Sequence, residues 1–301
     1  MIPVLPMPAA IAALQAALRA GLEPEADPPR SVVPVRHGQL LLMPADWDGY
    51  TGVKLASVAP GNSGNGLPRI QGTYLLLDAG TLSPLGTLDG IALTAVRTAA
   101  VSAVAADLLA GADAARLVVF GSGPQARSHV AALRAVRPIR EVIVVARDAA
   151  KAEAFAAECA RDGLAARTGT ASAVAHADLI ACCTTARTPL FDGATLNPRA
   201  TVVAVGSHEP EAREVDDVVM GQCAVVVETR TVALREAGDV MQAVDAGALD
   251  PAELIELSAL AKGAATLPPG PRIFKSVGMA WEDLVVAAAS YEASRENHRG
   301  R

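Results

Sequence analysis

The sequence predicts an α/β protein in two parts, one built on a parallel sheet and the other of the α+β type. Apolar runs of strand length alternate with helical segments in the middle of the chain, as in "RLVVF", "EVIVVA" and "AVVVE". Continuous rather than alternating hydrophobicity is typical of strands covered on both faces, as in a parallel βαβ sheet. The chain before this region contains strand-like runs separated by turn residues such as "PGNSGNGLP", which favours an antiparallel sheet.

These patterns place a Rossmann-type domain at residues 111–272. An α+β domain takes residues 1–110, and the tail 273–301 is expected to return to it and complete it. With 301 residues the chain is long enough for two ordinary domains.

The expected elements follow in chain order. A short extended start and an amphipathic helix occupy residues 1–20, and β runs follow at 31–45, 52–60 and 72–81. An Ala-rich helix at 92–111 links the two domains. The strands and helices expected in the Rossmann-type domain are 116–120, 121–136, 141–146, 148–163, 178–185, 200–207 and 224–228. One strand, one glycine turn and a closing helix end the chain.

Composition and charge exclude several classes of partner. The formal net charge is −6 and no block of Lys and Arg stands out, so we expect neither nucleic acid nor an anionic membrane to bind. No basic stretch precedes an apolar one at the start, and no uninterrupted apolar run reaches the ~18 residues of a membrane span. Four cysteines without a CxxC spacing indicate structural thiols in a reducing cytoplasm. Five scattered histidines predict no metal site.

The segment "VVFGSGPQA" is a candidate dinucleotide-binding turn, because it places a G-x-G-x-x-A spacing between a strand and a helix. Gly121 allows the tight turn, and Gly123 lets the backbone approach a pyrophosphate. Ala126 lets the helix pack close to the strand, while the helix N-terminus offers N–H groups to the anion.

The end of the next strand bears on the choice of cofactor. NAD enzymes usually place Asp or Glu there for the ribose 2′-hydroxyl, whereas this chain has Ala146 and Arg147. Arg147 suits a 2′-phosphate. Asp148 follows, and it is either a hydroxyl ligand or the cap of the next helix. The sequence therefore favours NADP(H), with NAD(H) as the alternative.

Three basic residues stand in apolar surroundings and need an anionic partner. Arg97 lies within the Ala-rich helix, Lys54 interrupts the strand "GVKLASVA", and Arg30 precedes the first β run. One interpretation is a salt bridge to a protein carboxylate, or a side chain that reaches water. The other is that all three converge on the carboxylate of a substrate.

Four segments occur in the order seen in the ornithine cyclodeaminase/mu-crystallin family, which the chain resembles from about Arg30 to its final helix. They are "GVKLASVAPGN", "LTAVRTAAVSAVAADLLA", "FGSGPQAR" and "FKSVGMAWEDL". The resemblance implies a Rossmann domain joined to a substrate-binding domain that also forms a homodimer. Family members include cyclodeaminases, cyclic imine (ketimine) reductases, alanine dehydrogenases and the hormone-binding mu-crystallins.

The resemblance also implies roles for single residues. Arg30, Lys54 and Arg97 are similar to the residues that hold the substrate carboxylate, and we include Lys54 among the candidate catalytic residues. In addition to the glycine turn and Arg147, the resemblance implies further cofactor-binding positions. They are Gln125 in "GSGPQAR", Thr184 and Thr185 near the nicotinamide ribose, and Ser276 and Gly278 next to the nicotinamide.

His208 in "TVVAVGSHEP" departs from the cyclodeaminase pattern. Ornithine cyclodeaminases carry a catalytic aspartate at the matching position, where it attracts the distal amine of the substrate. A histidine does not attract an ammonium in this way. Its unperturbed pKa near ~6.5 suits it instead to donate a proton to a cyclic imine. The alternative is a polar residue capping the following helix or loop, paired with Glu209 or Glu214.

These inferences predict an NAD(P)H-dependent reductase for a small cyclic imino acid. The expected substrates are Δ1-pyrroline-2-carboxylate or Δ1-piperideine-2-carboxylate, reduced to L-proline or L-pipecolate. Three alternatives stay open: an ornithine cyclodeaminase that forms L-proline and ammonia with bound NAD, an alanine dehydrogenase, and a non-catalytic NADP(H)-dependent binder. We further expect a cytoplasmic homodimer.

Overall fold

The computed structural model describes residues 1–299, without the side chains of Ser63 and of residues 297–299. The chain forms two compact units. Unit 1 comprises Met1–Ala100 and the C-terminal residues from Met279, and unit 2 comprises Val101–Gly278. Helix α2 (Gly90–Leu109) contributes residues to both units.

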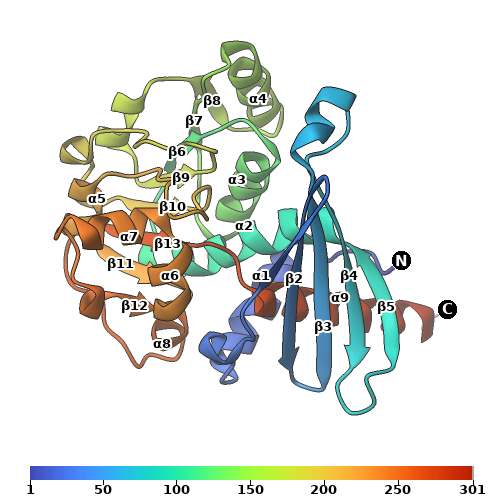
Figure 1. Ribbon diagram of the computed structural model, residues 1–301. Coiled ribbons are helices and arrows are strands. Elements are labelled where there is room, and N and C mark those ends of the chain that lie inside the picture. Colours follow the sequence, from blue (N-terminus) through green and yellow to red (C-terminus); the bar gives the residue numbers. More distant parts are fainter. Residues whose placement is uncertain (300–301) are drawn as a thin grey trace. The chain divides into compact units, whose positions relative to one another are not determined.

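Unit 1 is built on a five-stranded antiparallel sheet with the strands in chain order (Figure 1). The strands are β1 (Ser31–Val35), β2 (Gly38–Trp47), β3 (Tyr50–Val58), β4 (Ile70–Asp78) and β5 (Pro84–Asp89). Asp48 and Gly49 join β2 to β3, and both have positive φ (51° and 81°), as a two-residue hairpin turn requires. Helix α9 (Ala280–Arg299) contacts β2, β3 and β4, and α1 (Met7–Arg19) packs on α9.

The strand register places one cation in the core of unit 1. Met43, Lys54, Tyr74 and Leu88 are paired in one row across β2 to β5, and all four are buried. Three of these side chains suit a core, but an ammonium there is costly unless an anion neutralises it. The fold therefore has to supply a carboxylate opposite Lys54, and α9 does so.

Unit 2 is built on an eight-stranded sheet, and its neighbouring strands pair in parallel throughout the described residues. The strand order is β12-β11-β13-β10-β9-β6-β7-β8. The strands are β6 (Arg116–Phe120), β7 (Glu141–Val145), β8 (Ala165–Thr168), β9 (Leu179–Cys182), β10 (Thr201–Ala204), β11 (Ala224–Val227), β12 (Ile255–Glu256) and β13 (Arg272–Lys275). This sheet beside the antiparallel one confirms the predicted α/β fold class.

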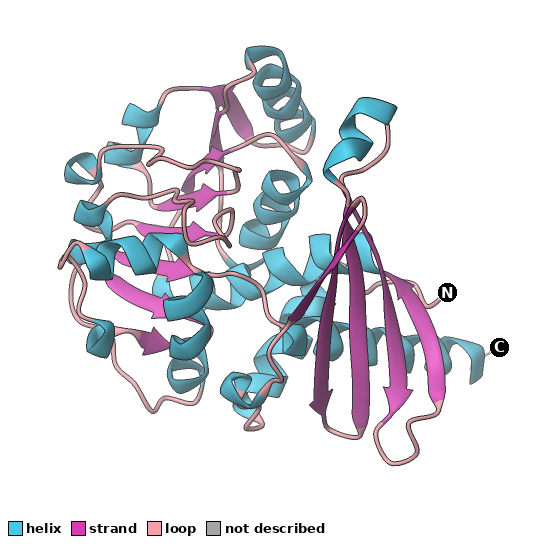
Figure 2. Ribbon diagram, in the orientation of Figure 1, coloured by secondary structure: helices cyan, strands magenta, loops and turns pink. Residues whose placement is uncertain are grey.

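Helices lie on both sides of the column of strands in unit 2 (Figure 2). They are α3 (Pro124–Val136), α4 (Ala149–Arg161), α5 (Asp217–Gln222), α6 (Arg230–Glu236), α7 (Gly238–Asp245) and α8 (Leu257–Ala261). The chain reverses its direction of winding between β6 and β9, so the crevice beyond their carboxyl ends is where such sheets bind ligands.

Helix α2 is long and apolar enough, by length and composition, to cross a membrane. Of its most apolar stretch, 61% is buried inside the protein. Residues 99–106 of this helix are almost entirely inaccessible to solvent. A core helix that is covered on all sides has the same composition.

Candidate functional site

The glycine turn of unit 2 lies between β6 and α3, as the sequence predicted. Gly121 has a φ of +107°, and a side chain there would meet the Cys183 carbonyl oxygen at 2.6 Å. Both observations require glycine. Gly123 is the N-cap of α3 and gives it no side-chain cap, and a side chain at Gly123 would meet nothing within 4 Å.

The first turn of α3 is therefore suited to hold a phosphate through its backbone N–H groups. Pro124 begins the helix at a position where its missing N–H is not needed. Gln125 follows, and Ala126 is fully buried against the strands. The residues present fit the pyrophosphate of a dinucleotide.

His129 fixes α3 from its buried side, a role that the sequence did not indicate. Its Nδ1 lies 2.8 Å from the Gln125 carbonyl oxygen, which can only accept, so Nδ1 carries the hydrogen. Its Nε2 lies 3.0 Å from the Ser102 hydroxyl and accepts from it. Burial lowers the pKa of His129 to about 4, so the imidazole is neutral at neutral pH.

At the end of β7, Asp148 takes one of its two predicted roles. This residue is the N-cap of α4: its carboxylate accepts a hydrogen bond from the Lys151 backbone N–H at 3.1 Å. That hydrogen bond lowers the pKa of Asp148. Arg147 is exposed beside it. The carboxylate therefore acts as a helix cap, while the neighbouring arginine is exposed.

The carboxyl end of β9 delivers Thr184 and Thr185, which the sequence placed near the cofactor. Thr184 is fixed because its backbone N–H and its hydroxyl both donate to one oxygen of Glu214, each at 2.7 Å. Thr185 is exposed. Glu214 also accepts from the Gly206 N–H at 2.7 Å, so one buried carboxylate joins the ends of β9 and β10.

A second buried carboxylate, Glu228, holds the turn that follows β13. It accepts from the Ser276 hydroxyl at 2.6 Å and from the backbone N–H groups of Val277 and Gly278 at 3.0 and 3.1 Å. Ser276 and Gly278, the predicted neighbours of the nicotinamide, are thus fixed by one acid. Sequence reasoning missed Glu228, although an acid that ends the apolar run "AVVVE" is an identifiable signal.

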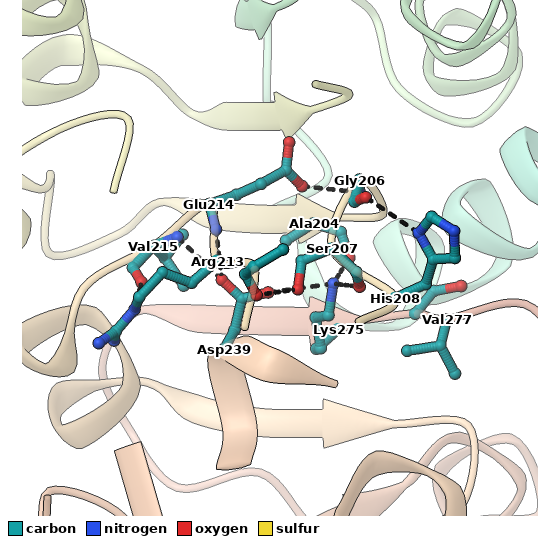
Figure 3. Close-up of polar contacts among 12 residues, drawn as sticks. Ala204, Gly206, Ser207, His208, Arg213, Glu214, Val215, Asp239, Lys275 and Val277 are labelled. Carbon is teal, nitrogen blue, oxygen red and sulfur yellow. Dashed lines mark hydrogen bonds and ion pairs between the residues drawn. The ribbon is translucent and has the colours of Figure 1, made fainter. Parts of the chain in front are cut away.

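His208 lies on the exposed part of the loop that follows β10 (Figure 3). Its Nδ1 is 3.3 Å from the Gly206 carbonyl oxygen. Glu209 pairs with Arg187 at 3.2 Å, and Glu214 binds Thr184 and Gly206. Within the described residues, the two acids considered as partners of His208 are thus engaged elsewhere.

In unit 1, Lys54 and Arg97 come together on the carboxylates of α9. The Lys54 Nζ lies 2.7 Å from Asp283 Oδ2, and the Arg97 Nε lies 3.2 Å from the other oxygen of Asp283. Arg97 also pairs with Glu282 at 2.5 Å. All four side chains are buried, and the two positive charges are balanced by two negative ones.

The structure thus joins two of the three predicted carboxylate-binding residues and shows that each has an internal acid. Arg30 is partly buried immediately before β1, and its place beside Lys54 and Arg97 stays a prediction. Glu282 and Asp283 were not predicted to be functional. The sequence contains an indication of their role, because both acids lie in the apolar segment "MAWEDLVVAAA". Acids in a buried helix require cations as partners.

The electrostatics of this cluster leave Lys54 able to change its charge near neutral pH. Burial and the neighbouring Arg97 lower the pKa of Lys54 to about 8, against the opposing effect of Asp283. Asp27 accepts from the Trp281 backbone N–H at 2.7 Å at the start of α9. Burial, with a contribution from Asp283, raises the pKa of Asp27 to about 7.

The arrangement matches a known family. A model of the ornithine cyclodeaminase/mu-crystallin family matches residues 5–298. The chain belongs to the ornithine cyclodeaminase/mu-crystallin family. The resemblance stated from the sequence is thereby confirmed.

Three proteins to which the chain is similar are reductases by name. The ketimine reductase mu-crystallin of Rattus norvegicus is 38% identical over 271 residues, which cover 88% of this chain and 84% of that protein. The Delta(1)-pyrroline-2-carboxylate reductase of Bacillus cereus is 34% identical over 289 residues, covering 90% and 89%. The structure of the Thermococcus litoralis Delta(1)-pyrroline-2-carboxylate reductase, solved with NADH and L-proline, superposes with a TM-score of 0.90. Its sequence is 29% identical, and the match covers 98% of this chain and 95% of that one.

Proposed function

We propose that this family member is an NAD(P)H-dependent ketimine reductase that reduces a small cyclic imino acid of the Δ1-pyrroline-2-carboxylate or Δ1-piperideine-2-carboxylate type. The products are L-proline or L-pipecolate. The observation that carries the proposal is that Asp283 holds Lys54 and Arg97 side by side, which brings two cations together where a ligand carboxylate can join them. Relatives named as reductases of such imines support it.

The substrate carboxylate is bound by Lys54 and Arg97, with Arg30 as the third cation. Arginine presents five N–H donors in a planar fork, so one guanidinium can hold a carboxylate of the protein and one of a ligand together. Glu282 and Asp283 orient both cations before the substrate arrives. Such preorganisation fixes the orientation in which the substrate carboxylate is bound.

The cofactor is held by the turn at Gly121 and Gly123 and by the first turn of α3. When bound, the nicotinamide would supply the hydride. We propose a preference for NADP(H) over NAD(H). Arg147 is exposed and suits a 2′-phosphate, whereas the carboxylate of Asp148 already accepts from the Lys151 N–H.

His208 is the proposed proton donor to the imine nitrogen. If Nδ1 donates to the Gly206 carbonyl oxygen, Nε2 is left to give or take a proton. A histidine at this position, where cyclodeaminases carry aspartate, favours reduction of an imine over elimination of ammonia from a diamine. Lys54 is the second candidate donor, since its pKa of about 8 lets it release a proton near neutrality.

We also propose that the protein is a homodimer formed through the outer face of the unit 1 sheet. Lys54 faces α9, so its neighbour Leu55 and the paired Leu42 face the other way. Leu55 is 43% exposed and Val33, on the same face, is 42% exposed. An open apolar sheet face of this kind is typical of a surface that a second copy covers.

The test of the proposed function is oxidation of NADPH in the presence of the cyclic imine. The wild-type protein should consume NADPH with Δ1-pyrroline-2-carboxylate or Δ1-piperideine-2-carboxylate, and His208→Gln should lower kcat. A preparation that binds NADPH but turns over neither imine would refute the reductase. Ammonia release from L-ornithine without net cofactor change would instead establish a cyclodeaminase.

A further inference from the structure

Three buried charged side chains meet at the carboxyl ends of β10 and β13, and none of them has a role in the reaction so far. Lys275 is the last residue of β13, Asp239 lies in α7, and Glu214 follows the loop of residues 205–213, here called the His208 loop. We call Glu214, Asp239 and Lys275 the buried triad, since each is at most 1% exposed. Burying three charges costs free energy, so their contacts should show what they hold.

Lys275 fixes the beginning of the His208 loop. Its ammonium donates to the carbonyl oxygen of Ser207 at 2.6 Å and to that of Ala204 at 3.4 Å. The third neighbour of Nζ is Asp239 Oδ2 at 3.1 Å (Figure 3). The first two contacts are hydrogen bonds and the third is an ion pair. Ser207 directly precedes His208.

Asp239 fixes the end of the same loop. Its Oδ1 accepts from the backbone N–H groups of Glu214 and Val215 at 2.6 and 3.0 Å. Inside the loop, the Ser207 hydroxyl donates to the Ala212 carbonyl oxygen at 2.5 Å. The two ends of the loop are therefore joined to one another and to the Lys275–Asp239 pair.

Glu214 ties the loop to the neighbouring strand end. One of its oxygens accepts from Thr184, and the other accepts from the Gly206 N–H. Burial raises the pKa of Glu214, while Lys275 and the hydrogen bonds from Thr184 oppose that rise. Hydrogen bonds to an ionised acceptor are stronger than those to a neutral one. A neutral side chain at position 214 would therefore hold Thr184 and Gly206 less strongly.

We propose that the buried triad is a positioning device for the His208 loop, and that Lys275 sets the place of His208 relative to the nicotinamide turn. This inference rests on the proposed function. Lys275 holds the loop through Ser207, and its own chain continues into Ser276, so one strand end fixes both the proton-donor loop and that turn. All anchors are buried, whereas His208 to Glu211 between them are exposed. A general acid must be held in reach of its acceptor, which an unanchored exposed loop does not achieve.

The decisive variant is Asp239→Asn. The amide keeps the size of the carboxylate but turns one acceptor into a donor, which opposes either Lys275 or the N–H groups of Glu214 and Val215. Asp178→Asn is the matched control. Asp178 also accepts from two consecutive backbone N–H groups, those of Ala115 and Arg116, both at 2.9 Å. It lies at the amino ends of β6 and β9, the opposite edge of the same sheet.

The first measurement is hydrogen exchange of the cofactor-bound protein, which needs no turnover. Amides of residues 205–213 should exchange about tenfold faster or more in Asp239→Asn, and at the wild-type rate in Asp178→Asn. Equal loop exchange in Asp239→Asn and wild type would overturn the proposal. The exchange rates of the loop do not depend on turnover. Failure of the proposed reductase activity can therefore be distinguished from failure of the positioning proposal.

The second measurement is a double-mutant cycle on the reductase reaction. Asp239→Asn should lower kcat about tenfold or more and leave the Kd for NADPH within about twofold. In the His208→Gln background it should lower kcat by less than about twofold, because its effect passes through His208. If Asp239→Asn lowered kcat by the same factor in the wild-type and the His208→Gln backgrounds, the proposal would be overturned. If Asp239→Asn does not fold, Ser207→Ala removes only the bond to Ala212 and should give the same pattern with smaller changes.

Discussion

The hydroxyl of Tyr74 occupies the place that a side chain at Gly52, on the neighbouring strand of the unit 1 sheet, would take. A side chain at position 52 would overlap the Tyr74 Oη and would come within 2.6 Å of its Cζ. The Tyr74 ring fills the space that glycine leaves, next to Lys54 in the buried row. Within the part of the chain that the structure describes, the buried Tyr74 hydroxyl has no hydrogen-bond partner.

This contact predicts opposite effects for two small substitutions. Gly52→Ala should lower the free energy of unfolding by about 1–3 kcal/mol, because the added methyl overpacks the core. Tyr74→Phe should leave that free energy unchanged or raise it by about 1 kcal/mol, since it removes an unsatisfied buried hydroxyl. Guanidinium unfolding of both variants beside the wild type measures this. A destabilised Tyr74→Phe would show that the hydroxyl is satisfied after all.

Asp27 predicts a stability that falls as the pH rises. Burial raises the pKa of this acid from 3.8 to about 7, so the folded protein holds a proton that the unfolded chain has already released. That contribution is present at low pH and is lost as the pH rises through about 7. Asp27→Asn keeps an acceptor for the Trp281 N–H and carries no charge.

The two proteins should therefore have similar unfolding free energies near pH 4. At pH 8 the Asp27→Asn variant should be more stable by more than about 1 kcal/mol. Denaturant titrations at several pH values give the comparison. A difference that does not change with pH would mean that folding does not raise the pKa of Asp27.

Lys54 predicts pH-dependent binding of carboxylate ligands. Because its pKa is lowered to about 8, it loses its positive charge above that pH. The Kd for pyrrole-2-carboxylate, a planar mimic of the imino acid, should rise about tenfold between pH 7 and pH 9. Calorimetric titration measures it. Lys54→Arg should bind with a nearly constant Kd over this range, and a wild-type Kd that is equally flat would exclude Lys54 from the binding site.

Arg147 predicts cofactor selectivity. Arg147→Ala should raise the Kd for NADPH about tenfold or more and change the Kd for NADH by less than about twofold, because only NADPH carries the 2′-phosphate. Fluorescence titration of both cofactors measures this. Arg161→Ala, an exposed arginine in the last turn of α4, is the control for net charge and should change neither Kd. Equal losses for both cofactors would contradict the assignment.

A substitution at the exposed Leu55 tests the proposed homodimer. Leu55→Asp places a charge on the outer face of the unit 1 sheet and should convert a dimer into a monomer, because an unpaired buried carboxylate is costly. Sedimentation or light scattering measures the mass. Leu234→Asp puts the same change on an exposed leucine of α6 in unit 2 and should leave the mass unchanged. A monomeric wild type would refute the dimer.

Most inner strands of the unit 2 sheet were predictable because they are continuous apolar runs. The inner strand β13 was expected in the tail that completes the other domain, but it pairs with β10 and β11, because Ile273 and Phe274 are buried in this sheet. β6, β7, β9, β10 and β11 all lie within segments that the sequence identified as strands. β8, at one edge of that sheet, was missed because "AART" is short and polar, and β12, at the other edge, has only two residues. Edge strands lack the two-sided burial on which the pattern depends.

The site was predictable where the chemistry is local and not where it depends on distant pairing. The glycine turn at Gly121 is one continuous motif, so the sequence located it. Lys54 and Arg97 were selected as cations in apolar segments, but periodicity does not reveal that Asp283 pairs with both. Asp239 was not predicted for the same reason, since it pairs with Lys275 far away in the sequence. Glu214 was considered only as a partner of His208, whereas it binds Thr184 and Gly206.

The neutral imidazole of His129 predicts that the protein loses its bound nucleotide at low pH. Because the pKa of His129 is lowered from 6.5 to about 4, its contribution to stability is lost as the pH falls through that interval. Full protonation would place an unpaired cation between α2 and α3. The helix affected is α3, whose first turn is the proposed phosphate-binding site. Acid exposure should therefore strip the coenzyme before the bulk of the parallel sheet unfolds.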